Sequence, residues 1–120
     1  MAAEKNFEEK VKTFLKDRDC WFIKYWGGGQ FTKAGVPDLI ICVDGNFVAV
    51  ELKAPKGRPS ALQIKCLQDI VHANGIAILL YPKDFDAFKD FIDELKEGVP
   101  VDTLIDMYPF VTDWWYRYDI

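Results

Sequence analysis

Two carboxylates and a lysine have the types and spacing needed to act on a phosphate ester. Asp38 follows a proline, and one residue separates Glu51 from Lys53. Because side chains in a strand alternate between two faces, Glu51 and Lys53 share a face if they lie in a strand. Acidic side chains crowded on one face repel each other unless a cation lies between them. Magnesium fits this need, because it binds one or two carboxylates, keeps several waters and contacts substrate phosphate.

The segment between these residues decides whether the three side chains meet. Two short apolar runs carry them, and Asp44-Gly45-Asn46 between the runs is typical of a tight hairpin turn. A two-residue loop at the first two turn positions brings Asp38 opposite Glu51, and one at the last two brings Asp38 opposite Lys53. Both registers place all three side chains on one face. A three-residue loop would instead pair Asp38 with Leu52 and separate the cluster. In the predicted arrangement, the carbonyl of Leu52 is an additional oxygen ligand for the metal.

Hydrophobic periodicity and turn residues predict an α-β-β-β-α-β-α order. The expected helices cover residues 4–18, 60–74 and 84–96, and the expected strands cover residues 20–25, 37–43, 47–53 and 76–81. Ser60 and Gln63 form a capping box at the second helix, and Gly75 is expected to end that helix. The step from the third strand through the second helix to the last strand is a βαβ unit, which implies parallel pairing. We therefore predict an α/β fold with a mixed sheet flanked by helices.

Two further segments interrupt or follow these elements. A loop opens at the glycine run 27–29 and continues to about Gly35. Residues 99–120 are rich in aromatic and acidic side chains and show no clear periodicity. We expect a domain over residues 1–98 and an extension over 99–120 that packs on the domain or on a second subunit.

The motifs in their order resemble a known nuclease family. The matching stretches are Gly35-Val36-Pro37-Asp38-Leu39-Ile40, Val50-Glu51-Leu52-Lys53-Ala54-Pro55-Lys56-Gly57 and Ser60-x-Leu62-Gln63. Together they resemble the VRR-NUC (virus-type replication-repair nuclease) branch of the PD-(D/E)xK superfamily, and in particular its small stand-alone phage and bacterial forms. The resemblance covers residues 5–96. It implies a restriction-endonuclease-like αβββαβ core.

The resemblance also implies a role for each matching residue. Asp38 and Glu51 would bind Mg²⁺ or Mn²⁺, and Lys53 would be the catalytic lysine. Gln63 matches the glutamine that marks this branch, a role that can coexist with capping.

An acidic residue of the first helix commonly completes such a metal site. Glu8 is our first choice, because it lies one turn before Val11 and can lean toward the sheet. Glu9 is the alternative, and Glu4 is the least favoured of the three. For each of them, an ordinary solvated glutamate is the competing interpretation.

Several polar side chains near these motifs are candidates for DNA contacts. They are Lys24, Lys33, Lys56, Arg58 and Ser60. The competing interpretation for each lysine and arginine is a solvated surface residue. Trp21 is expected in the core rather than on DNA. Trp114 and Trp115 lie in the acidic extension, which would repel phosphate, so we expect them to pack within the protein. His72, inside a helix, is expected to be structural.

Composition and charge exclude several classes of protein. The sequence contains no run of about 18 apolar residues, so it predicts no transmembrane helix, and the first residues carry no apolar signal core. We therefore expect a cytoplasmic protein, in a bacterial cell or in the host of a phage. The three cysteines, Cys20, Cys42 and Cys66, form no CxxC pair and are expected to be buried free thiols. The net charge is −4, yet residues 1–70 hold 11 Lys/Arg and 9 Asp/Glu, so the first part can still present a basic face.

These observations lead to a functional hypothesis and two alternatives. We expect a Mg²⁺- or Mn²⁺-dependent endonuclease that hydrolyses DNA phosphodiester bonds. The resemblance implies branched DNA such as junctions or flaps, in replication, repair or recombination. A homodimer is expected by analogy, because one small domain holds one site and junction cutting needs two. The alternatives are a non-catalytic DNA-binding module and a protein that binds a partner through its acidic, aromatic extension.

Overall fold

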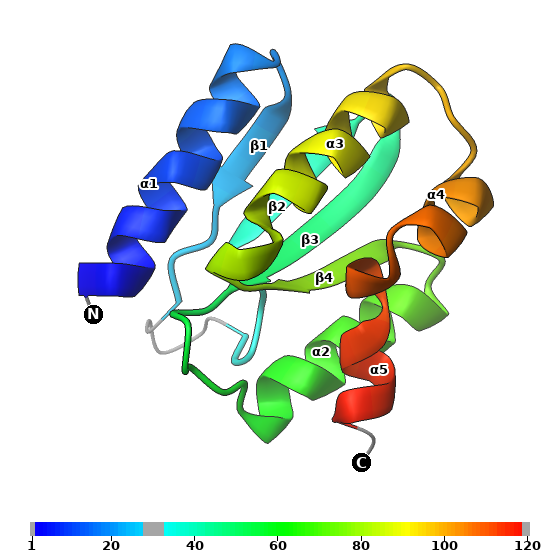
Figure 1. Cartoon of the computed structure of the whole chain (residues 1–120). Helices are drawn as coiled ribbons and strands as arrows, with labels where there is room; N and C mark the ends of the chain where they lie inside the picture. Colours follow the sequence, from blue (N-terminus) through cyan, green and yellow to red (C-terminus); the bar gives the residue numbers. More distant parts are fainter. Residues whose placement is uncertain (1, 28–32, 119–120) are drawn as a thin grey trace.

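A mixed four-stranded sheet forms the centre of the protein (Figure 1). The computed structural model describes residues 2–27 and 33–118, so residues 28–32 of the predicted glycine loop lie outside the described part. The strands lie in the order β1-β2-β3-β4; β1–β2 and β2–β3 are antiparallel, and β3–β4 are parallel. The elements are α1 (Ala2–Asp17), β1 (Trp21–Lys24), β2 (Leu39–Val43), β3 (Asn46–Leu52), α2 (Ala61–His72), β4 (Ile76–Leu80), η1 (Pro82–Asp84), α3 (Phe85–Lys96), α4 (Val101–Met107), η2 (Pro109–Val111) and α5 (Asp113–Arg117). The predicted mixed α/β architecture is confirmed.

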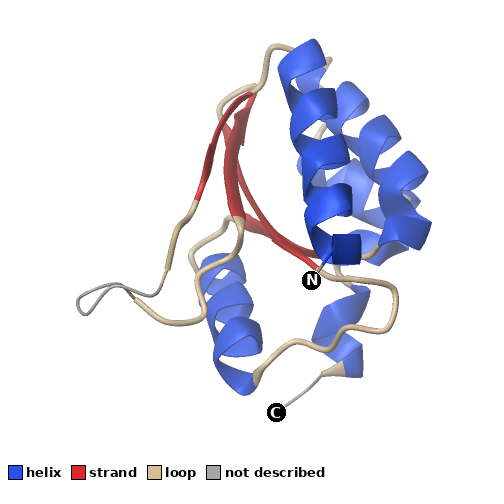
Figure 2. Cartoon of the chain, turned by 90° about the vertical axis from the view of Figure 1, so that its left-hand side faces the viewer, coloured by secondary structure: helices blue, strands red, loops and turns tan. Residues whose placement is uncertain are grey.

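Two hydrophobic cores lie on opposite faces of the sheet. Helices α1 and α3 cover one face, where the larger core includes Leu15, Val50 and Phe88. Helix α2 covers the other face beside β4, where the smaller core includes Leu67 and Trp114. Figure 2 shows that this second face carries helices only toward one end of the sheet. The side chains of Glu51 and Lys53 belong to this second face, because the alternating residues Val50 and Leu52 point into the larger core.

The β2–β3 hairpin has the tight turn that the sequence predicts. Val43 pairs with Asn46, so the loop consists of Asp44 and Gly45 alone. Both loop residues have positive φ, 49° and 80°, as a type I′ turn requires. Of the two predicted registers, the structure adopts the one that brings Asp38 toward Glu51. The outermost pair of the ladder is Leu39 with Val50, so Asp38 lies one residue outside the paired part of β2.

Helix α2 begins as predicted but ends differently. The side chain of Ser60 accepts a hydrogen bond from the backbone N–H of Gln63, and the side-chain oxygen of Gln63 accepts one from the backbone N–H of Ser60. At the other end, Asn74 and not Gly75 takes the left-handed conformation, with φ of 68°. The N–H of Gly75 closes the helix by donating to the carbonyl of Ile70, 2.9 Å away. Glycine is needed at position 75 for space, because a Cβ there would lie 2.8 Å from Cγ2 of Ile70.

The segment after α3, for which the sequence predicts no element, folds as α4, η2 and α5. Trp114 of α5 is only 1% exposed and lies in the smaller core. Its indole N–H lies 2.8 Å from the carbonyl oxygen of Ala77 and 3.1 Å from that of Val111, so both oxygens are within hydrogen-bonding distance. His72 contacts this region through an edge-to-face arrangement with Trp115.

Two burial predictions are wrong for the same physical reason. Trp21 is 62% exposed rather than in the core, and Cys42, its partner in the β1–β2 ladder, is exposed rather than buried. Both side chains point to the sheet face away from α1, which no helix covers at that edge (Figure 2). Of the other two thiols, Cys66 is buried as predicted and Cys20 is partly exposed.

Over residues 2–27 and 33–118, none of the helices is both long and apolar enough to cross a membrane.

Candidate active site

Asp38 is fixed at the point where β2 begins and β3 ends. Its carboxylate oxygen Oδ2 accepts a hydrogen bond from the backbone N–H of Leu52, at 2.8 Å. Its carbonyl accepts one from the backbone N–H of Tyr25, also at 2.8 Å. Asp38 therefore bridges the ends of β1 and β3, and one oxygen of its carboxylate is held in place by the backbone. For the carbonyl oxygen of Leu52, the role of metal ligand remains a prediction.

Glu51 is a buried carboxylate with one oxygen left over. Its side chain is 4% exposed, and its oxygen Oε2 accepts a hydrogen bond from Nε2 of Gln63 at 3.0 Å. The same oxygen lies 3.4 Å from Nζ of Lys53. The other oxygen, Oε1, is buried and has no hydrogen-bond partner among the described residues. Burial, followed by the negative charge of Asp38, raises the pKa of Glu51 to about 8, although Lys53 opposes the shift.

Gln63 holds the lysine and the glutamate in one arrangement. Its oxygen Oε1 accepts hydrogen bonds from Nζ of Lys53 at 3.0 Å and from the backbone N–H of Ser60 at 2.8 Å. Its Nε2 donates to Glu51, so the amide can have only one orientation in this network. The capping contact with Ser60 and the contacts with Lys53 and Glu51 therefore coexist in one side chain, while the site role of Gln63 stays a prediction. Ser60 takes part through the cap, where it orients Gln63.

The first helix contributes Glu8, and a lysine that the sequence analysis assigned to DNA lies beside it. Nζ of Lys24 lies 2.7 Å from Oε1 of Glu8 and 3.2 Å from Oδ1 of Asp38. Burial alone would lower the pKa of Lys24, but the hydrogen bond to Glu8 and the charge of Asp38 outweigh burial and raise it. The pKa of Glu8 is lowered, because the hydrogen bonds and charges of Lys24 and Lys12 outweigh its burial.

This contact separates Glu8 from the two alternatives on the same helix. Glu9 has a side chain 58% exposed and pairs with Lys12 at 3.3 Å. Glu8, whose side chain is 14% exposed, is linked to Asp38 through the shared ammonium of Lys24. Glu4 makes no ion pair with the other described residues. The helix carboxylate of the candidate site is therefore Glu8.

The donor set fits a hard divalent cation, although it is not assembled around one. Within the described residues, no group of three His, Cys, Asp or Glu side chains is arranged to hold a metal ion. The ammonium of Lys24 takes the place of a cation between Glu8 and Asp38, and Glu51 keeps a bare buried oxygen. Carboxylate oxygens are the ligands that Mg²⁺ and Mn²⁺ prefer. Movement of the Lys24 ammonium would free Oε1 of Glu8 and Oδ1 of Asp38.

The other residues predicted to contact DNA lie in loops. Lys56 and Arg58 are exposed in the loop that follows Lys53. They line a pocket together with Tyr81, Lys83, Arg117 and Tyr118. Lys33 is exposed, and its carbonyl accepts a hydrogen bond from the hydroxyl of Tyr25.

Tyr81 and Arg117 lie near the candidate site but were not predicted from the sequence, and the contacts of Lys24 were not predicted either. Tyr81 follows β4, whose parallel register with β3 pairs Leu52 with Leu80, so the βαβ pattern could have placed Tyr81 beside Lys53. Arg117 had no such signal, because nothing in residues 99–120 indicates where they pack. The role of Lys24 as a bridge between Glu8 and Asp38 depends on the position of α1 over the sheet edge, which periodicity does not give.

No protein-family model matches the chain, and no curated protein is significantly similar to it in sequence.

Proposed function

We propose that this chain is a metal-dependent endonuclease that hydrolyses DNA phosphodiester bonds, with the PD-(D/E)xK core that its motifs resemble. Asp38, Glu51 and Glu8 would hold Mg²⁺ or Mn²⁺, with the carbonyl of Leu52 as a further ligand. Lys53 would be the catalytic lysine, and Gln63 would position it. Branched DNA, such as junctions or flaps, is the substrate class that the VRR-NUC resemblance implies. An enzyme acting on such DNA in replication, repair or recombination would work in the cytoplasm of a bacterium or of a phage-infected host.

One observation supports this proposal most strongly, namely the bare oxygen of Glu51. A buried carboxylate oxygen without a hydrogen-bond partner is costly, because its desolvation is not repaid. This oxygen lies in a site that also holds the carboxylate of Asp38 and the amine of Lys53. A site kept only for stability would satisfy this oxygen or replace the carboxylate with an apolar group. A divalent cation would satisfy it and neutralise the repulsion between the two acids.

The chemistry follows from what each side chain can do at a phosphodiester. A bound divalent ion supplies charge neutralisation at the phosphate and lowers the pKa of water. Lys53, held by Gln63 at 3.0 Å, presents an ammonium to the negative charge that builds on the phosphate oxygens. Glu51, whose Oε2 lies 3.4 Å from Nζ of Lys53, would keep that ammonium on the sheet face where the metal would be held. The backbone hydrogen bond from Leu52 prevents the Asp38 carboxylate from turning away.

Cleavage of labelled DNA tests this proposal directly. Single-stranded, duplex, flap and four-way substrates are incubated with the full chain in Mg²⁺, Mn²⁺ or EDTA. We expect cleavage with either metal, none in EDTA, and a fall of at least about 100-fold for Lys53→Ala, as for loss of one transition-state contact. Lys10→Ala is the matched control, since Lys10 is an exposed lysine on α1. Equal persistence of all substrates with wild type and Lys53→Ala would refute the proposal.

A non-catalytic DNA-binding module is the second candidate, and the position of Lys24 favours it. An ammonium between Glu8 and Asp38 stabilises these acids without any metal. The two candidates differ in one measurable respect. A non-catalytic module binds the same DNA in EDTA as in Mg²⁺ and leaves it intact, whereas the nuclease depends on the metal.

The predicted homodimer remains a proposal, and the uncovered sheet face is where it can be tested. Trp21, Ile23 and Phe47 are exposed apolar side chains on β1 and β3. Sedimentation of wild type and of Trp21→Ser/Ile23→Ser would show a monomeric variant if this face joins two copies. Deletion of residues 99–120 is a poor test of a partner-binding extension, because Trp114 is part of the core.

A further inference from the structure

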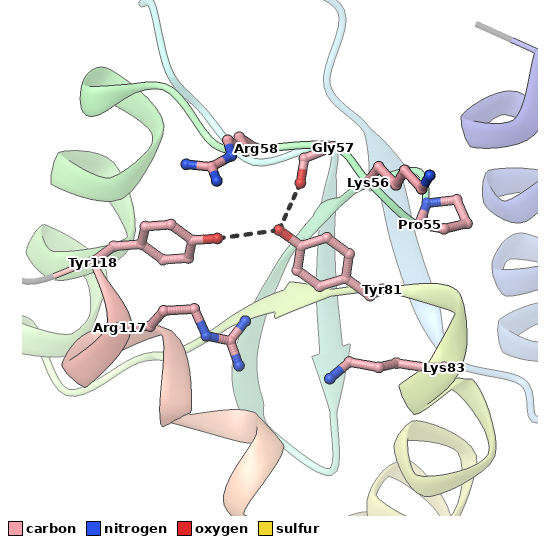
Figure 3. A pocket seen from close by; sticks show the side chains of 8 residues that line it. All are labelled: Pro55, Lys56, Gly57, Arg58, Tyr81, Lys83, Arg117 and Tyr118. Atoms are coloured by element: carbon pink, nitrogen blue, oxygen red, sulfur yellow. Dashed lines mark hydrogen bonds between the residues drawn. The ribbon is translucent and has the colours of Figure 1, made fainter.

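A second polar site lies directly beside Lys53 and is built largely by residues outside the motifs. It is a pocket of about 530 Å³ between the loop after β3, the end of β4 and helix α5. Four of its lining residues are cationic, namely Lys56, Arg58, Lys83 and Arg117, and none of the described residues that line it is acidic. Figure 3 shows that the side chains of Arg117 and Lys83 reach toward each other below the two tyrosines, while Lys56 points away at the rim.

The two tyrosines form the floor of this pocket. The hydroxyl of Tyr81 donates to the carbonyl of Gly57 at 2.8 Å and lies 3.5 Å from the hydroxyl of Tyr118 (Figure 3). Burial, followed by the hydrogen bond with Tyr118, raises the pKa of Tyr81 to about 12, so this phenol keeps its proton. Because Tyr81 donates its proton to Gly57, Tyr118 is the donor in the contact between the two hydroxyls, and its hydroxyl can turn to a ligand by giving up this long 3.5 Å contact.

The cations of the pocket are largely free to bind an anion. Within the described residues, Arg58 and Lys83 make no ion pair. Arg117 uses Nη2 to pair with Asp113 of the same helix at 2.9 Å. A guanidinium has five N–H donors, so this pairing leaves donors for a ligand. Three cations from three separate segments around a phenol floor match the needs of a phosphate group, which carries charge and several acceptor oxygens.

The position of the pocket indicates which phosphate it would meet. Gly57 is a common wall, because a Cβ on it would lie 3.4 Å from Cδ of Lys53, while its carbonyl accepts from Tyr81. The backbone N–H of Lys53 donates to the carbonyl of Leu80, the residue before Tyr81, at 3.0 Å. Lys53 and Tyr81 thus directly follow two adjacent strands, β3 and β4, whose ends lie side by side. A nucleic-acid strand with one phosphate at Lys53 would carry its next phosphates toward this pocket.

We infer that the pocket formed by Arg58, Lys83, Arg117 and Tyr118 binds an internal phosphate of the DNA strand that flanks the phosphate to be cleaved. This inference rests on the proposed nuclease function for the location of the scissile phosphate. It gives the C-terminal extension a role, since α5 supplies Arg117 and the residue after it is Tyr118. The pocket would then fix the register of the strand at Lys53.

Binding measurements with neutralised phosphates test the inference. Labelled DNA carries single methylphosphonates at successive positions, and its affinity is measured in Ca²⁺ by fluorescence anisotropy for four proteins. Three of them are wild type, Arg58→Gln/Lys83→Gln, and the matched control Lys10→Gln/Lys16→Gln, which removes two exposed lysines of α1. A third variant, Arg117→Gln, tests the contribution of α5 alone.

We expect the double pocket variant to bind unmodified DNA roughly tenfold more weakly than wild type, with a salt dependence reduced by about one phosphate contact. Wild type should lose affinity at one methylphosphonate position beside the cleavage site, and the double pocket variant should be insensitive there. Arg117→Gln should show a smaller change of the same kind, and the control should behave as wild type. Equal affinity of wild type and pocket variants, or a loss that follows only removal of a terminal phosphate, would overturn the inference.

The experiment separates this inference from the proposed function. If the chain cleaves no DNA with any metal but the pocket variants still lose binding and salt dependence, the nuclease proposal fails and the phosphate pocket stands. If cleavage depends on Lys53 while the pocket variants bind and cut as wild type does, the inference fails and the nuclease stands.

Discussion

Replacement of Glu51 by glutamine should change how the stability of the protein depends on pH. In the absence of metal, burial and Asp38 raise the pKa of Glu51 from 4.5 to about 8. Between these two pH values the folded protein holds a proton that the unfolded chain has lost. The free energy of unfolding therefore falls as the pH rises through this window, and the loss is complete above about pH 8.

The size of the effect follows from the same two values. One pH unit of difference corresponds to about 1.4 kcal/mol, so the complete shift corresponds to on the order of 5 kcal/mol. Glutamine has the same shape as the protonated acid and carries no charge. Glu51→Gln should therefore match wild type near pH 4 and exceed it in free energy of unfolding by up to about 5 kcal/mol at pH 9.

Urea unfolding in EDTA, followed by tryptophan fluorescence at pH 5, 7 and 9, measures this difference. Glu97→Gln is the matched control, because Glu97 is an exposed glutamate just after α3. The control should follow the wild-type pH dependence. If Glu51→Gln and wild type give parallel curves across this range, the carboxylate is not held in the repulsive, buried state described above, and the main argument for a cation at this site is lost.

Three further substitutions test other parts of the account. Lys24→Met should lower the free energy of unfolding in EDTA by about 1–2 kcal/mol, because Glu8 and Asp38 lose the cation they share, and should tighten Mn²⁺ binding; unchanged values in both assays would contradict the bridging role of Lys24. Ser60→Ala should cost about 1 kcal/mol in urea unfolding through loss of the α2 cap, and a cost near zero would contradict the capping box. Trp114→Ala should cost about 3–5 kcal/mol, whereas Trp21→Ala at the exposed sheet edge should cost less than about 1 kcal/mol in the same assay; similar costs for the two tryptophans would contradict their assigned burial.

The parts of the site that the sequence predicts are those fixed by local chemistry. Asp44 and Gly45 favour the two positive φ angles of a two-residue loop, and that loop alone sets the β2–β3 register. The register then brings Asp38 to Glu51 without any information about distant parts of the chain. The capping box likewise fixes Gln63 at the first turn of α2, within reach of Lys53.

The parts that the sequence does not predict depend on packing between distant segments. Lys24 reaches Glu8 and Asp38 because α1 lies over the edge strand, and no local pattern gives that placement. Trp21 has strong strand propensity and large apolar area, yet at the β1 edge of the face it points to, no helix of the described residues covers the sheet. Trp114 is buried through the five-residue helix α5, which is too short to show a hydrophobic period, so its burial has no signal in hydrophobic spacing.

The most direct test of the central claim is Mn²⁺ binding to the full chain, measured by the electron paramagnetic resonance signal of free Mn²⁺. Wild type and Asp38→Asn/Glu51→Gln are compared at pH 8, with Mg²⁺ added as competitor. We predict that wild type binds Mn²⁺, that Mg²⁺ displaces it, and that the double variant binds at least about tenfold more weakly, as expected for loss of two carboxylate ligands. Equal Mn²⁺ binding by the two proteins, or none by wild type, would contradict the claim that these carboxylates form a metal site.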